Sequence, residues 1–363
     1  RFGLIVHTKG RNPCMKRYGN LYEKIYDMDN LKLAHQNAKK GKGWYAEVKM
    51  VDADEEKYLT MLQQMLINKT YHTSEYTTFI KNDGSKKREI FKLPYFPDRI
   101  CQWAILQAIL IRNFTDNTYS AIPGRGIHLV LNRLQDAIRN DVPGTQYCLK
   151  LDVKKYYPSI DHSILKEKFR RIFKDCDLLW LLDEIIDSTP GDTGIPIGNY
   201  LSQYSGNFYL SAFDHWLKEV KHVKYYYRYM DDIVILHESK EYLHQLKKEI
   251  DEYFKTKLKL TIKENWQVFP TFDRGVDFVG YRTFLNYTLL RKSTCKQFKL
   301  KMKALNKKQQ NSEEMTFSEW CSVNSYRGWL VHCDSYRLSM KYIEPIKGYS
   351  NEYYIKNIKR KVA

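Results

Sequence analysis

Three aspartates lie where strand-forming sequence ends or turns. Asp152 stands at the end of the alternating apolar segment 146–153, and Asp231 and Asp232 are adjacent between two runs of β-forming residues. Continued strand alternation would bury one of two neighbouring carboxylates without a partner, at a high cost in free energy. A tight turn instead lets both side chains project together, so the sequence predicts a hairpin turn at 231–232.

A third carboxylate beside such a pair would suit two Mg²⁺ ions, about 3.5–4 Å apart, in an in-line phosphoryl displacement. Mg²⁺ prefers a few carboxylates plus substrate phosphates to a complete protein cage. Each aspartate also has a simpler explanation: Asp152 as a helix N-cap or turn residue, and Asp231 with Asp232 as a solvated turn. One strand-end aspartate plus the hairpin pair is the minimum set of ligands for nucleotidyl transfer.

The elements that would position these residues follow from hydrophobic periodicity. Helical spacing occurs in 21–31, 54–68, 99–114, 127–139, 164–173, 178–188, 201–219 and 241–258, and in most of the chain from 292 onward. Strand-like alternation predicts a hairpin over 71–91 with a turn at Asn82-Asp83-Gly84, a strand at 146–153, two strands at 224–237 and two short strands at 276–290. The fold class is therefore α+β, with a few antiparallel strands and helices packed on one face.

Composition limits the function classes. The 363 residues are 43% hydrophobic, which excludes general disorder, and the length predicts two or three subdomains. The 60 Lys and Arg against 42 Asp and Glu give a charge of +18, which points to nucleic acid first and an anionic membrane surface second. We find no apolar run of the roughly 18–20 residues that a membrane span needs, and no secretory signal.

Cysteine usage predicts a reducing compartment. The seven cysteines form no CxxC pair, so neither a disulfide framework nor a zinc ribbon is indicated. Cys321, Cys333 and His332 lack a second ligand pair with zinc-like spacing, and we interpret both cysteines as free thiols.

Six segments, in order along the chain, resemble the motifs of reverse transcriptases. Two resemble the fingers motifs, and four resemble the polymerase motifs A, B, C and E: Lys86–Ile90 with Pro94, Asp98, Arg99 and Gln102; Ile122–His128; Leu151–Asp161; Gly194–Gln203; Tyr229–Asp232; and Phe278–Tyr281. The resemblance covers nearly everything after Met15.

The resemblance implies a right-hand polymerase. Residues 15–140 would form the fingers, 141–285 the palm, with the motif B region bridging to the fingers, and 286–363 a basic helical thumb and C-terminal tail. Residues 1–14 show no clear period, and we expect them to be a leader, a cloning remnant or upstream read-through.

The resemblance also assigns catalytic roles. Asp152, Asp231 and Asp232 would be the catalytic carboxylates and would bind two Mg²⁺ ions, with Mn²⁺ as a substitute and the carbonyl of Val153 as a further ligand. One ion would activate the primer 3′-hydroxyl, and the other would hold the triphosphate and the leaving pyrophosphate.

Five residues are predicted to contact the incoming nucleotide. Tyr157 matches the aromatic gate that disfavours a 2′-hydroxyl, and Arg88 would clamp the triphosphate through bidentate contacts. Ile197 and Gly198 belong to motif B, where the backbone would pass close to the nucleotide. Lys263 is a candidate for the motif D lysine that protonates pyrophosphate. Tyr157 as a core residue, Arg88 as a solvated charge and Ile197 as a packed loop residue remain the alternatives.

A second set is predicted to bind primer and template: Tyr229, Gln203, Phe278, Gly280, Tyr281, Lys296, Lys299 and Lys303. The three lysines belong to the segment 291–310, which holds eight Lys and Arg and no acid. With Phe298, Leu300, Met302 and Leu305 between them, these cations would form one face of an amphipathic thumb helix against duplex phosphates. A merely solvated basic helix is the alternative.

Motif B departs from the common pattern. Most reverse transcriptases have Gln-Gly, three residues and Ser-Pro, whereas this chain has Ile197-Gly198, three residues and Ser202-Gln203. This variant resembles the bacterial or phage-encoded polymerases of diversity-generating retroelements, which carry out mutagenic retrohoming with errors at template adenines. Loss of a polar contact at Ile197 would cost about 1–2 kcal/mol of discrimination.

That resemblance implies cytoplasmic RNA-directed DNA synthesis from a structured template RNA and dNTPs, with a small basic oligomeric accessory protein and no membrane. A retron or group II intron-like reverse transcriptase is the nearest alternative, although the chain ends soon after the expected thumb. A non-catalytic nucleic-acid-binding protein with a polymerase fold is the remote one, because all three carboxylates are present.

Overall fold

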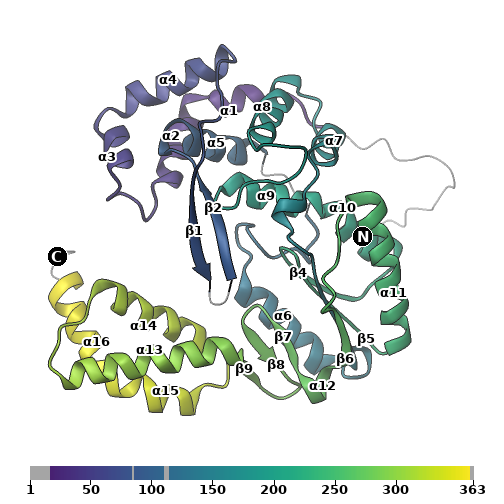
Figure 1. Ribbon diagram of the computed structural model, residues 1–363, viewed down its shortest axis with the longest axis vertical. Coiled ribbons are helices and arrows are strands. Elements are labelled where there is room, and N and C mark those ends of the chain that lie inside the picture. Colours follow the sequence, from purple (N-terminus) through teal and green to yellow (C-terminus); the bar gives the residue numbers. More distant parts are fainter. Residues whose placement is uncertain (1–16, 84–85, 110–113, 360–363) are drawn as a thin grey trace, which may run out of the picture. The chain divides into compact units, whose positions relative to one another are not determined.

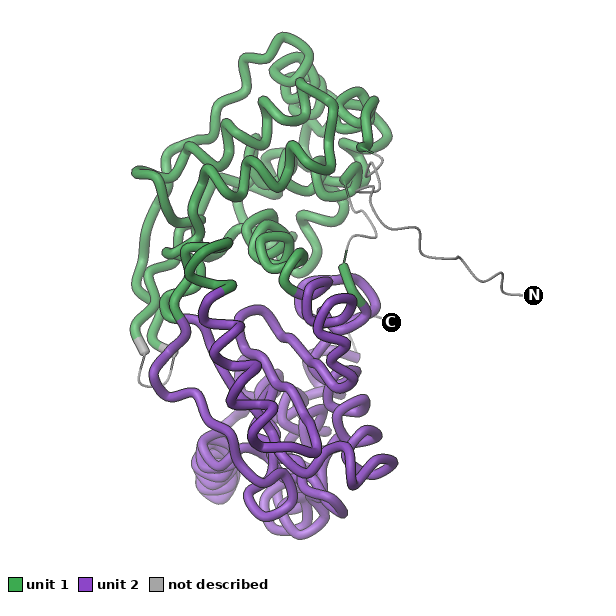
Figure 2. The backbone as a smooth tube through the Cα atoms, turned by 90° about the vertical axis from the view of Figure 1, so that its right-hand side faces the viewer, with its two compact units in different colours: residues 1–115, 154–213, 253–261 green, residues 116–153, 214–252, 262–363 purple. Residues whose placement is uncertain are grey.

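The computed structural model describes residues 17–83, 86–109 and 114–359. The expectations for residues 1–14, for Gly84 and for the last part of the C-terminal tail, 360–363, lie outside these ranges. The chain divides into two compact units that exchange segments (Figure 2): unit 1 holds residues 1–115, 154–213 and 253–261, and unit 2 holds 116–153, 214–252 and 262–363.

Unit 1 is mostly helical. Its helices are α1 Tyr22–Tyr26, α2 Met28–Ala38, α3 Ala46–Ala53, α4 Glu55–Ile67, α5 Ile100–Ile109, α7 His162–Ile172, α8 Cys176–Asp187 and α9 Tyr200–Tyr209, with shorter turns at Tyr95–Arg99, Tyr157–Ser159 and Phe254–Leu258. The strands β1 Thr77–Asp83 and β2 Lys86–Lys92 form an antiparallel hairpin. The predicted hairpin is therefore present, and β2 ends at Lys92, one residue beyond the expected range.

Aspartate side chains begin several of these helices. Asp27 accepts hydrogen bonds from two backbone N–H groups of α2, so the helix predicted over 21–31 is interrupted there. Asp175 caps α8 through Leu178 N and also accepts from Leu21 N and Tyr22 N at 2.7 and 2.9 Å. One carboxylate thus joins the starts of α1 and α8.

Unit 2 is built on a four-stranded antiparallel sheet with the order β4-β5-β3-β6, called here the central sheet (Figure 1). Its strands are β3 Tyr147–Asp152, β4 Tyr225–Tyr229, β5 Asp232–His237 and β6 Gln267–Pro270. Helix α6 Ile127–Asn140 packs its apolar face on the sheet, where Val130, Leu134 and Ile138 share a core with Cys148 and Val234. Helix α11 Lys240–Tyr253 follows β5.

A second antiparallel sheet in unit 2, the small sheet, consists of β7 Val276–Phe278, β8 Tyr281–Thr283 and β9 Thr288–Leu290. It leads into a helical bundle of α13 Lys292–Gln310, α14 Phe317–Leu330, α15 Tyr336–Tyr342 and α16 Lys347–Tyr354. Short helices lie before the small sheet, at Thr271–Arg274 (α12), and after α15, at Glu344–Ile346 and Ile355–Lys359. Tyr281, Phe298 and Leu330 belong to the core that joins this sheet to the bundle.

The architecture confirms an α+β fold with antiparallel sheets. Among the described residues, the elements that the sequence did not predict include α3, β6, the short helix α12 Thr271–Arg274 and the third strand of the small sheet. The helix expected over 201–219 is divided into α9, α10 Ser211–His215 and a short turn at Trp216–Val220. Within the described residues, no helix combines the length and the apolar character that crossing a membrane requires.

Candidate active site

The three aspartates meet at one end of the central sheet. Asp152, the last residue of β3, is the antiparallel partner of Asp232, the first residue of β5. Tyr229 pairs with Asp232 across the β4–β5 turn, which leaves Met230 and Asp231 as a two-residue loop. Met230 has the positive φ, 54°, that two-residue hairpin loops require. The structure therefore brings the three predicted carboxylates together within unit 2, and we call them the carboxylate site.

Burial and the charge of Asp152 raise the pKa values of Asp231 and Asp232. Burial, followed by the hydrogen bond and the charge of Asp152, raises the pKa of Asp231 well above its usual range. Burial also raises the pKa of Asp232 to about 6, against the lowering effect of Lys150 and with a further rise from Asp152. Such a group of carboxylates would be stabilised by a bound cation, because a cation removes the repulsion between them.

Two lysines act as counter-ions. The ammonium of Lys263 contacts the Asp152 carboxylate, and its backbone N donates to the Asp152 carbonyl at 2.9 Å. Lys150 Nζ lies 3.7 Å from Asp232 Oδ1 and donates to the Asp277 carbonyl. Lys150 was not predicted, although it stands two residues before Asp152 and so shares its face of the strand. The action of Lys263 on pyrophosphate stays a prediction.

The ligand set fits a divalent metal ion. One oxygen of Asp232 is buried and accepts no hydrogen bond from the described part of the chain. Hard cations such as Mg²⁺ take carboxylate oxygens as ligands. Asp152, Asp231 and Asp232 are therefore the residues that would hold it. The Val153 carbonyl stays a predicted ligand; the side chain of Val153 is buried, and the residue bridges to Ile262.

A buried ion pair supports the turn of the β4–β5 hairpin. The side chains of Arg228 and Asp214 are both fully buried, with Arg228 Nε 2.7 Å from one Asp214 oxygen and Nη2 on the other. Arg228 Nη1 also donates to the Met230 carbonyl at 3.0 Å. The hydroxyl groups of Tyr226 and Thr118 donate to Asp214 at 2.5 and 2.9 Å. These hydrogen bonds offset the desolvation of both charges.

Sequence reasoning missed this pair, although one signal was present. Arg228 lies on the same strand face as the fully buried Tyr226, and a charge on a buried face requires a buried partner. The sequence did not identify that partner, because Asp214 lies on helix α10 before β4 and reaches Arg228 only through the tertiary fold.

Four predicted nucleotide-binding residues lie on segments of unit 1 that bond to one another. The segment 189–199, which we call the motif B loop, precedes α9. Ile195 N donates to the Tyr157 carbonyl at 3.1 Å, and Phe91 N donates to the Ile197 carbonyl at 2.8 Å. Phe91 belongs to β2, the strand that also carries the exposed Arg88. Tyr157 is half-buried beside Gly206 of α9. The roles of these residues toward a nucleotide stay predictions.

The fold itself requires a glycine at position 198. Its φ is 124°, a conformation that L side chains rarely adopt, and a Cβ there would lie 2.7 Å from the Phe91 carbonyl oxygen. The sequence predicted a close approach to the nucleotide; the close approach that the structure shows is to β2. The glycine is therefore required for packing the motif B loop on that strand.

The predicted primer-grip segment is packed against helix α14. The side chains of Phe278 and Tyr281 are fully buried, so any primer contact would come from their backbone. The Tyr281 hydroxyl donates to the Trp329 carbonyl at 3.0 Å, and the two rings stack at 5.2 Å. Gly280 has φ 89°, and a Cβ there would lie 2.3 Å from the Trp329 ring. Trp329 therefore fixes this turn to the helical bundle.

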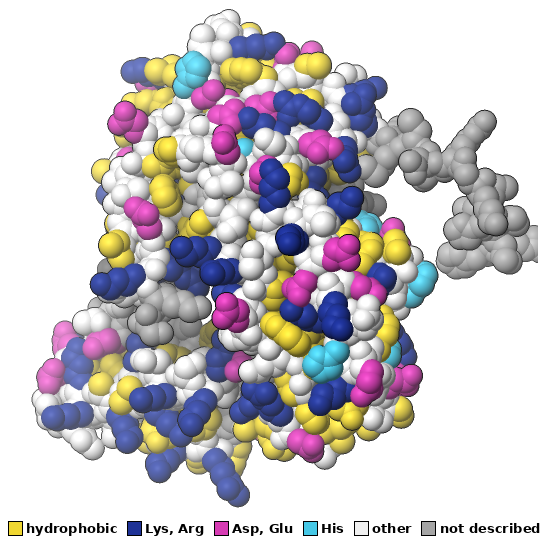
Figure 3. Space-filling model, turned by 45° about the vertical axis from the view of Figure 1, so that its right-hand side comes forward, with side chains coloured by type: hydrophobic (Ala, Val, Ile, Leu, Met, Phe, Trp, Pro, Cys, Tyr) yellow, Lys and Arg dark blue, Asp and Glu magenta, His cyan; other side chains and the backbone are white. Residues whose placement is uncertain are grey.

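Helix α13 has the predicted cationic face. Lys296 and Lys303 are exposed, and Lys299 is partly exposed between them. The buried positions are Phe298, Met302 and Leu305. Leu300 was expected on the apolar face but is 54% exposed, because it lies two residues from both Phe298 and Met302 and so points away from the core. Lys and Arg side chains are dense over the part of Figure 3 that holds the helical bundle.

The two remaining predicted contacts are both partly exposed. Tyr229 packs against the core of unit 2 beside the β4–β5 turn, and Gln203 lies in the first turns of α9 between the buried residues Ser202 and Tyr204. The position of neither side chain shows whether it would contact the primer or the template, so both assignments stay predictions.

One further group could resemble a metal site. His35, Asp52 and Glu55 bring ligand atoms within 4.8 Å of one another in unit 1. Lys39 Nζ lies 2.8 Å from the same Asp52 oxygen that His35 Nε2 contacts at 2.8 Å. Because an ammonium already neutralises this carboxylate, we interpret the group as an ion-pair network that joins α2, α3 and α4. Cys321 and Cys333 form no disulfide bond within the described residues.

Two comparisons with known proteins show distant similarity. The chain is 25% identical over 219 residues to the group II intron-encoded protein LtrA of Lactococcus lactis subsp. cremoris, a match that covers 56% of this chain and 36% of the relative. The chain thus spans about a third of the length of that relative. A solved structure of apo telomerase from Candida tropicalis, truncated from the C-terminal domain, aligns with a TM-score of 0.42 and 13% identity over 63% of this chain and 58% of that one.

A protein-family profile described as reverse transcriptase (RNA-dependent DNA polymerase) matches residues 80–283. The matched range includes the carboxylate site, the motif B loop, and the first two strands of the small sheet. The chain therefore belongs to the reverse transcriptase (RNA-dependent DNA polymerase) family.

Proposed function

We propose that the protein is an RNA-directed DNA polymerase that uses dNTPs and a template RNA. The observation that carries the proposal is the carboxylate site, in which Asp152 and Asp232 pair across β3 and β5 and Asp231 occupies the adjoining turn. The raised pKa values of Asp231 and Asp232, and the Asp232 oxygen that accepts no hydrogen bond from the described residues, favour a bound cation. Divalent ions, for which Mg²⁺ is our proposal, would activate the primer 3′-hydroxyl and neutralise the triphosphate.

The residues of this chain have separate tasks in that reaction. Arg228 holds the Met230 carbonyl, and with it the turn that presents Asp231. Lys150 and Lys263 balance the carboxylate charge when no ion is bound. We propose that the exposed Arg88 contacts the triphosphate and that the Tyr157 ring excludes a 2′-hydroxyl.

Primer extension on an RNA template tests the proposal. We expect wild-type protein to extend a DNA primer with Mg²⁺, and Asp231→Asn to lose extension by at least about a thousandfold, because one ligand of the reacting centre is gone. Asp273→Asn is the matched control: it removes an exposed carboxylate from the short helix α12 that is not one of the three carboxylates of the site. Metal-dependent RNA binding without any extension by the wild type would favour the non-catalytic alternative.

The finer proposal is the mutagenic polymerase of a diversity-generating retroelement. Its support is the motif B sequence, in which Ile197 stands where glutamine is usual, and the half-buried position of Ile197 in a loop bonded to β2. An isoleucine offers only apolar contact, so it would not report the geometry of an incoming nucleotide by a hydrogen bond. A basic oligomeric accessory protein and a structured template RNA would complete this system.

Sequencing of the cDNA tests this finer proposal. We expect Ile197→Gln to lower misincorporation opposite template adenines by about tenfold, since a recovered polar contact is worth about 1–2 kcal/mol. Ile195→Val, a small change at a buried neighbour in the same loop, is the control. An unchanged error frequency at adenines in Ile197→Gln would contradict the proposal.

A group II intron-like reverse transcriptase is the second candidate, favoured by the 25% identity to the intron-encoded relative. The two candidates differ in fidelity. Accurate copying of template adenines by the wild type, with or without other proteins, would favour the intron-like function. Frequent errors confined to adenines would favour the retroelement.

A further inference from the structure

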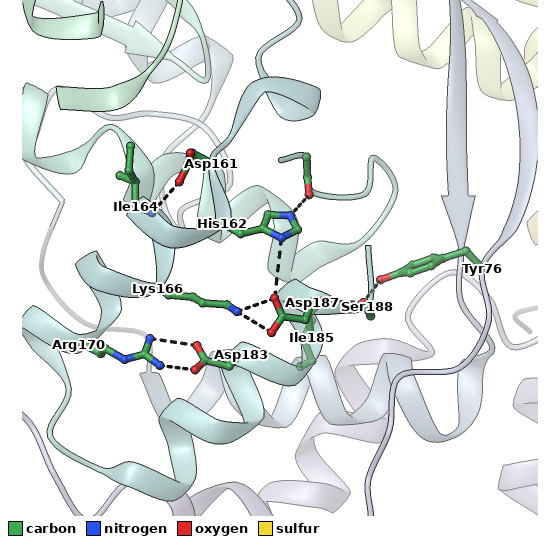
Figure 4. A network of polar contacts seen from close by, with 11 residues as sticks. Tyr76, Asp161, His162, Ile164, Lys166, Arg170, Asp183, Ile185, Asp187 and Ser188 are labelled. Carbon is green, nitrogen blue, oxygen red and sulfur yellow. Dashed lines mark hydrogen bonds and ion pairs between the residues drawn. The ribbon is translucent and has the colours of Figure 1, made fainter. Parts of the chain in front are cut away.

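The side chain of His162 reaches the middle of the motif B loop. His162 is the first residue of α7 and is buried, and its Nε2 lies 2.7 Å from the carbonyl oxygen of Gly194 (Figure 4). A carbonyl oxygen can only accept a hydrogen bond, so Nε2 carries the proton and donates it. This bond crosses from a helix to a loop in the interior of unit 1, where water does not compete for the donor.

Two carboxylates behind the imidazole hold α7 against α8. Asp187 Oδ1 lies 3.9 Å from His162 Nδ1, and Lys166 Nζ contacts both Asp187 oxygens at 2.5 Å. One turn further along the same helices, Arg170 pairs with Asp183 (Figure 4). The imidazole therefore has a fixed position from which to direct Nε2 toward the loop.

The contact at Gly194 adds a side-chain hydrogen bond to a loop segment that backbone bonds also hold. Gly194 is buried with φ 101°, and as a glycine its peptide groups are less restricted than those of other residues. Backbone hydrogen bonds secure the loop on both sides: His162 N to the Asp192 carbonyl at 3.0 Å, and Ile195 N to the Tyr157 carbonyl at 3.1 Å. Gly194 N also donates to the Ile160 carbonyl at 2.8 Å. The side chain of His162 binds the carbonyl of the same peptide group whose N–H, on Ile195, is bonded to Tyr157, so both polar groups of this peptide are held.

We propose that His162 is a positioning residue for nucleotide selection. By holding the Gly194 carbonyl, His162 sets the path of the loop as it continues to Ile197 and Gly198. Both residues lie against Phe91 of β2: the Ile197 carbonyl accepts from Phe91 N, and Gly198 approaches the Phe91 carbonyl closely. His162 does not touch the nucleotide and acts through the loop. This inference rests on the proposed polymerase function, and it predicts an effect on the choice and binding of dNTPs beyond any effect on folding.

Two amide variants separate this role from simple burial. Glutamine can place its amide N–H near the position of Nε2, whereas the shorter asparagine places it near Nδ1 and cannot reach the loop. We expect His162→Asn to raise the KM for dNTPs about tenfold with a smaller change in kcat, and to raise misincorporation, because a displaced loop defines the nucleotide less well. We expect His162→Gln to stay close to wild type.

Arg170→Gln is the matched control. It removes the ion pair with Asp183 on the same two helices, about two turns of α7 from His162 and without contact to the loop. We expect it to leave the KM for dNTPs and the error frequency unchanged. An equal rise of KM in the control and in His162→Asn would assign the effect to the helix pair, and would overturn the proposal.

Hydrogen–deuterium exchange tests the tether without catalysis. In the substrate-free protein we expect His162→Asn to speed exchange of the Gly194 and Ile195 amides at least about tenfold, with His162→Gln and Arg170→Gln like wild type. Unchanged exchange in His162→Asn would overturn the tether, and faster exchange with unaltered KM and errors would overturn its role in selection. A wild type without polymerase activity would instead refute the proposed function, while the exchange result would stand independently.

Discussion

Gly198 combines two constraints in one residue. A φ of 124° strains any L side chain, and the Phe91 carbonyl would lie 2.7 Å from a new Cβ. We expect Gly198→Ala to lower the free energy of unfolding by about 1–3 kcal/mol, because both the strain and the clash oppose the native loop. Urea denaturation measures this change.

Gly43→Ala is the control for that substitution. A Cβ at Gly43 would meet no described atom within 4 Å, so alanine should change stability little. A loss of stability in Gly198→Ala no larger than that in Gly43→Ala would show that the loop adapts to the side chain. The strain argument would then be wrong.

The carboxylate site should make stability depend on pH. A carboxyl group whose pKa is raised on folding binds its proton more tightly in the folded protein than in the unfolded chain. Its contribution is therefore fully present below about pH 4, the usual aspartate pKa, and is lost as the pH rises through the folded value. For Asp232 that value is about 6. We expect metal-free protein to lose stability over this interval.

Thermal unfolding of wild type and Asp232→Asn between pH 4 and 8 checks this expectation. The difference between the two melting temperatures should favour the variant increasingly as the pH rises, because asparagine carries no charge to repel Asp152. Mg²⁺ should raise the melting temperature of the wild type more at pH 8 than at pH 5, since protons compete with the ion. A constant difference across the pH range would contradict the raised pKa.

At the scale of elements, the hairpin β4–β5 depends on the ion pair of Arg228 and Asp214. Removing one partner leaves a buried charge uncompensated, so we expect Asp214→Asn to lower the free energy of unfolding by about 3–5 kcal/mol. Replacing both, as Arg228→Met with Asp214→Leu, should recover most of that loss. Primer extension should still fall by about tenfold or more in the double variant, because the Met230 carbonyl has lost its donor.

The two measurements separate stability from positioning. A double variant with full polymerase activity would show that Arg228 is only a packing element of unit 2. A double variant as unstable as Asp214→Asn would show that the instability comes from the hydroxyl groups of Tyr226 and Thr118, which lose their acceptor, rather than from an uncompensated charge.

Element prediction from the sequence succeeded where periodicity was strong. The alternation through β3 and on both sides of the Asp231 turn predicted the strands and the hairpin that form the carboxylate site. Strand β6 was missed because its four residues, Gln267–Pro270, show no periodicity and are defined only by pairing with β3. Local pattern does not contain that pairing.

Contacts between distant elements were the part of the site that sequence could not supply. Lys150 and Arg228 stand beside predicted motifs, yet their partners Asp277 and Asp214 are set by the fold. His162 was likewise unremarkable at the start of a predicted helix until the structure placed the Gly194 carbonyl against it. Motif resemblance identifies the groups that would react, whereas tertiary packing determines which residues hold them.

At the scale of the whole molecule, the charge of +18 favours binding of nucleic acid, and helix α13 carries a dense group of the basic residues. Lys296, Lys299 and Lys303 recur at spacings of three and four residues and so share one helix face. Each lysine that neutralises a phosphate contributes about 0.7–0.9 to the slope of log K against log salt concentration. We therefore expect replacement of all three by glutamine to reduce the slope for a primer–template duplex by about 2–3.

Binding titrations at several salt concentrations measure that slope, and an equal change of charge elsewhere provides the control. Lys240, Lys248 and Lys255 are exposed on α11 and the turn that follows it, so their replacement by glutamine also removes three charges. A general attraction between a basic protein and nucleic acid would lower the slope equally in both triple variants. A contact at α13 lowers the slope only in the variant that lacks Lys296, Lys299 and Lys303, because the slope counts the counter-ions released from phosphates that the protein contacts. Net charge elsewhere acts at a distance and is screened within about 10 Å at 0.1 M salt.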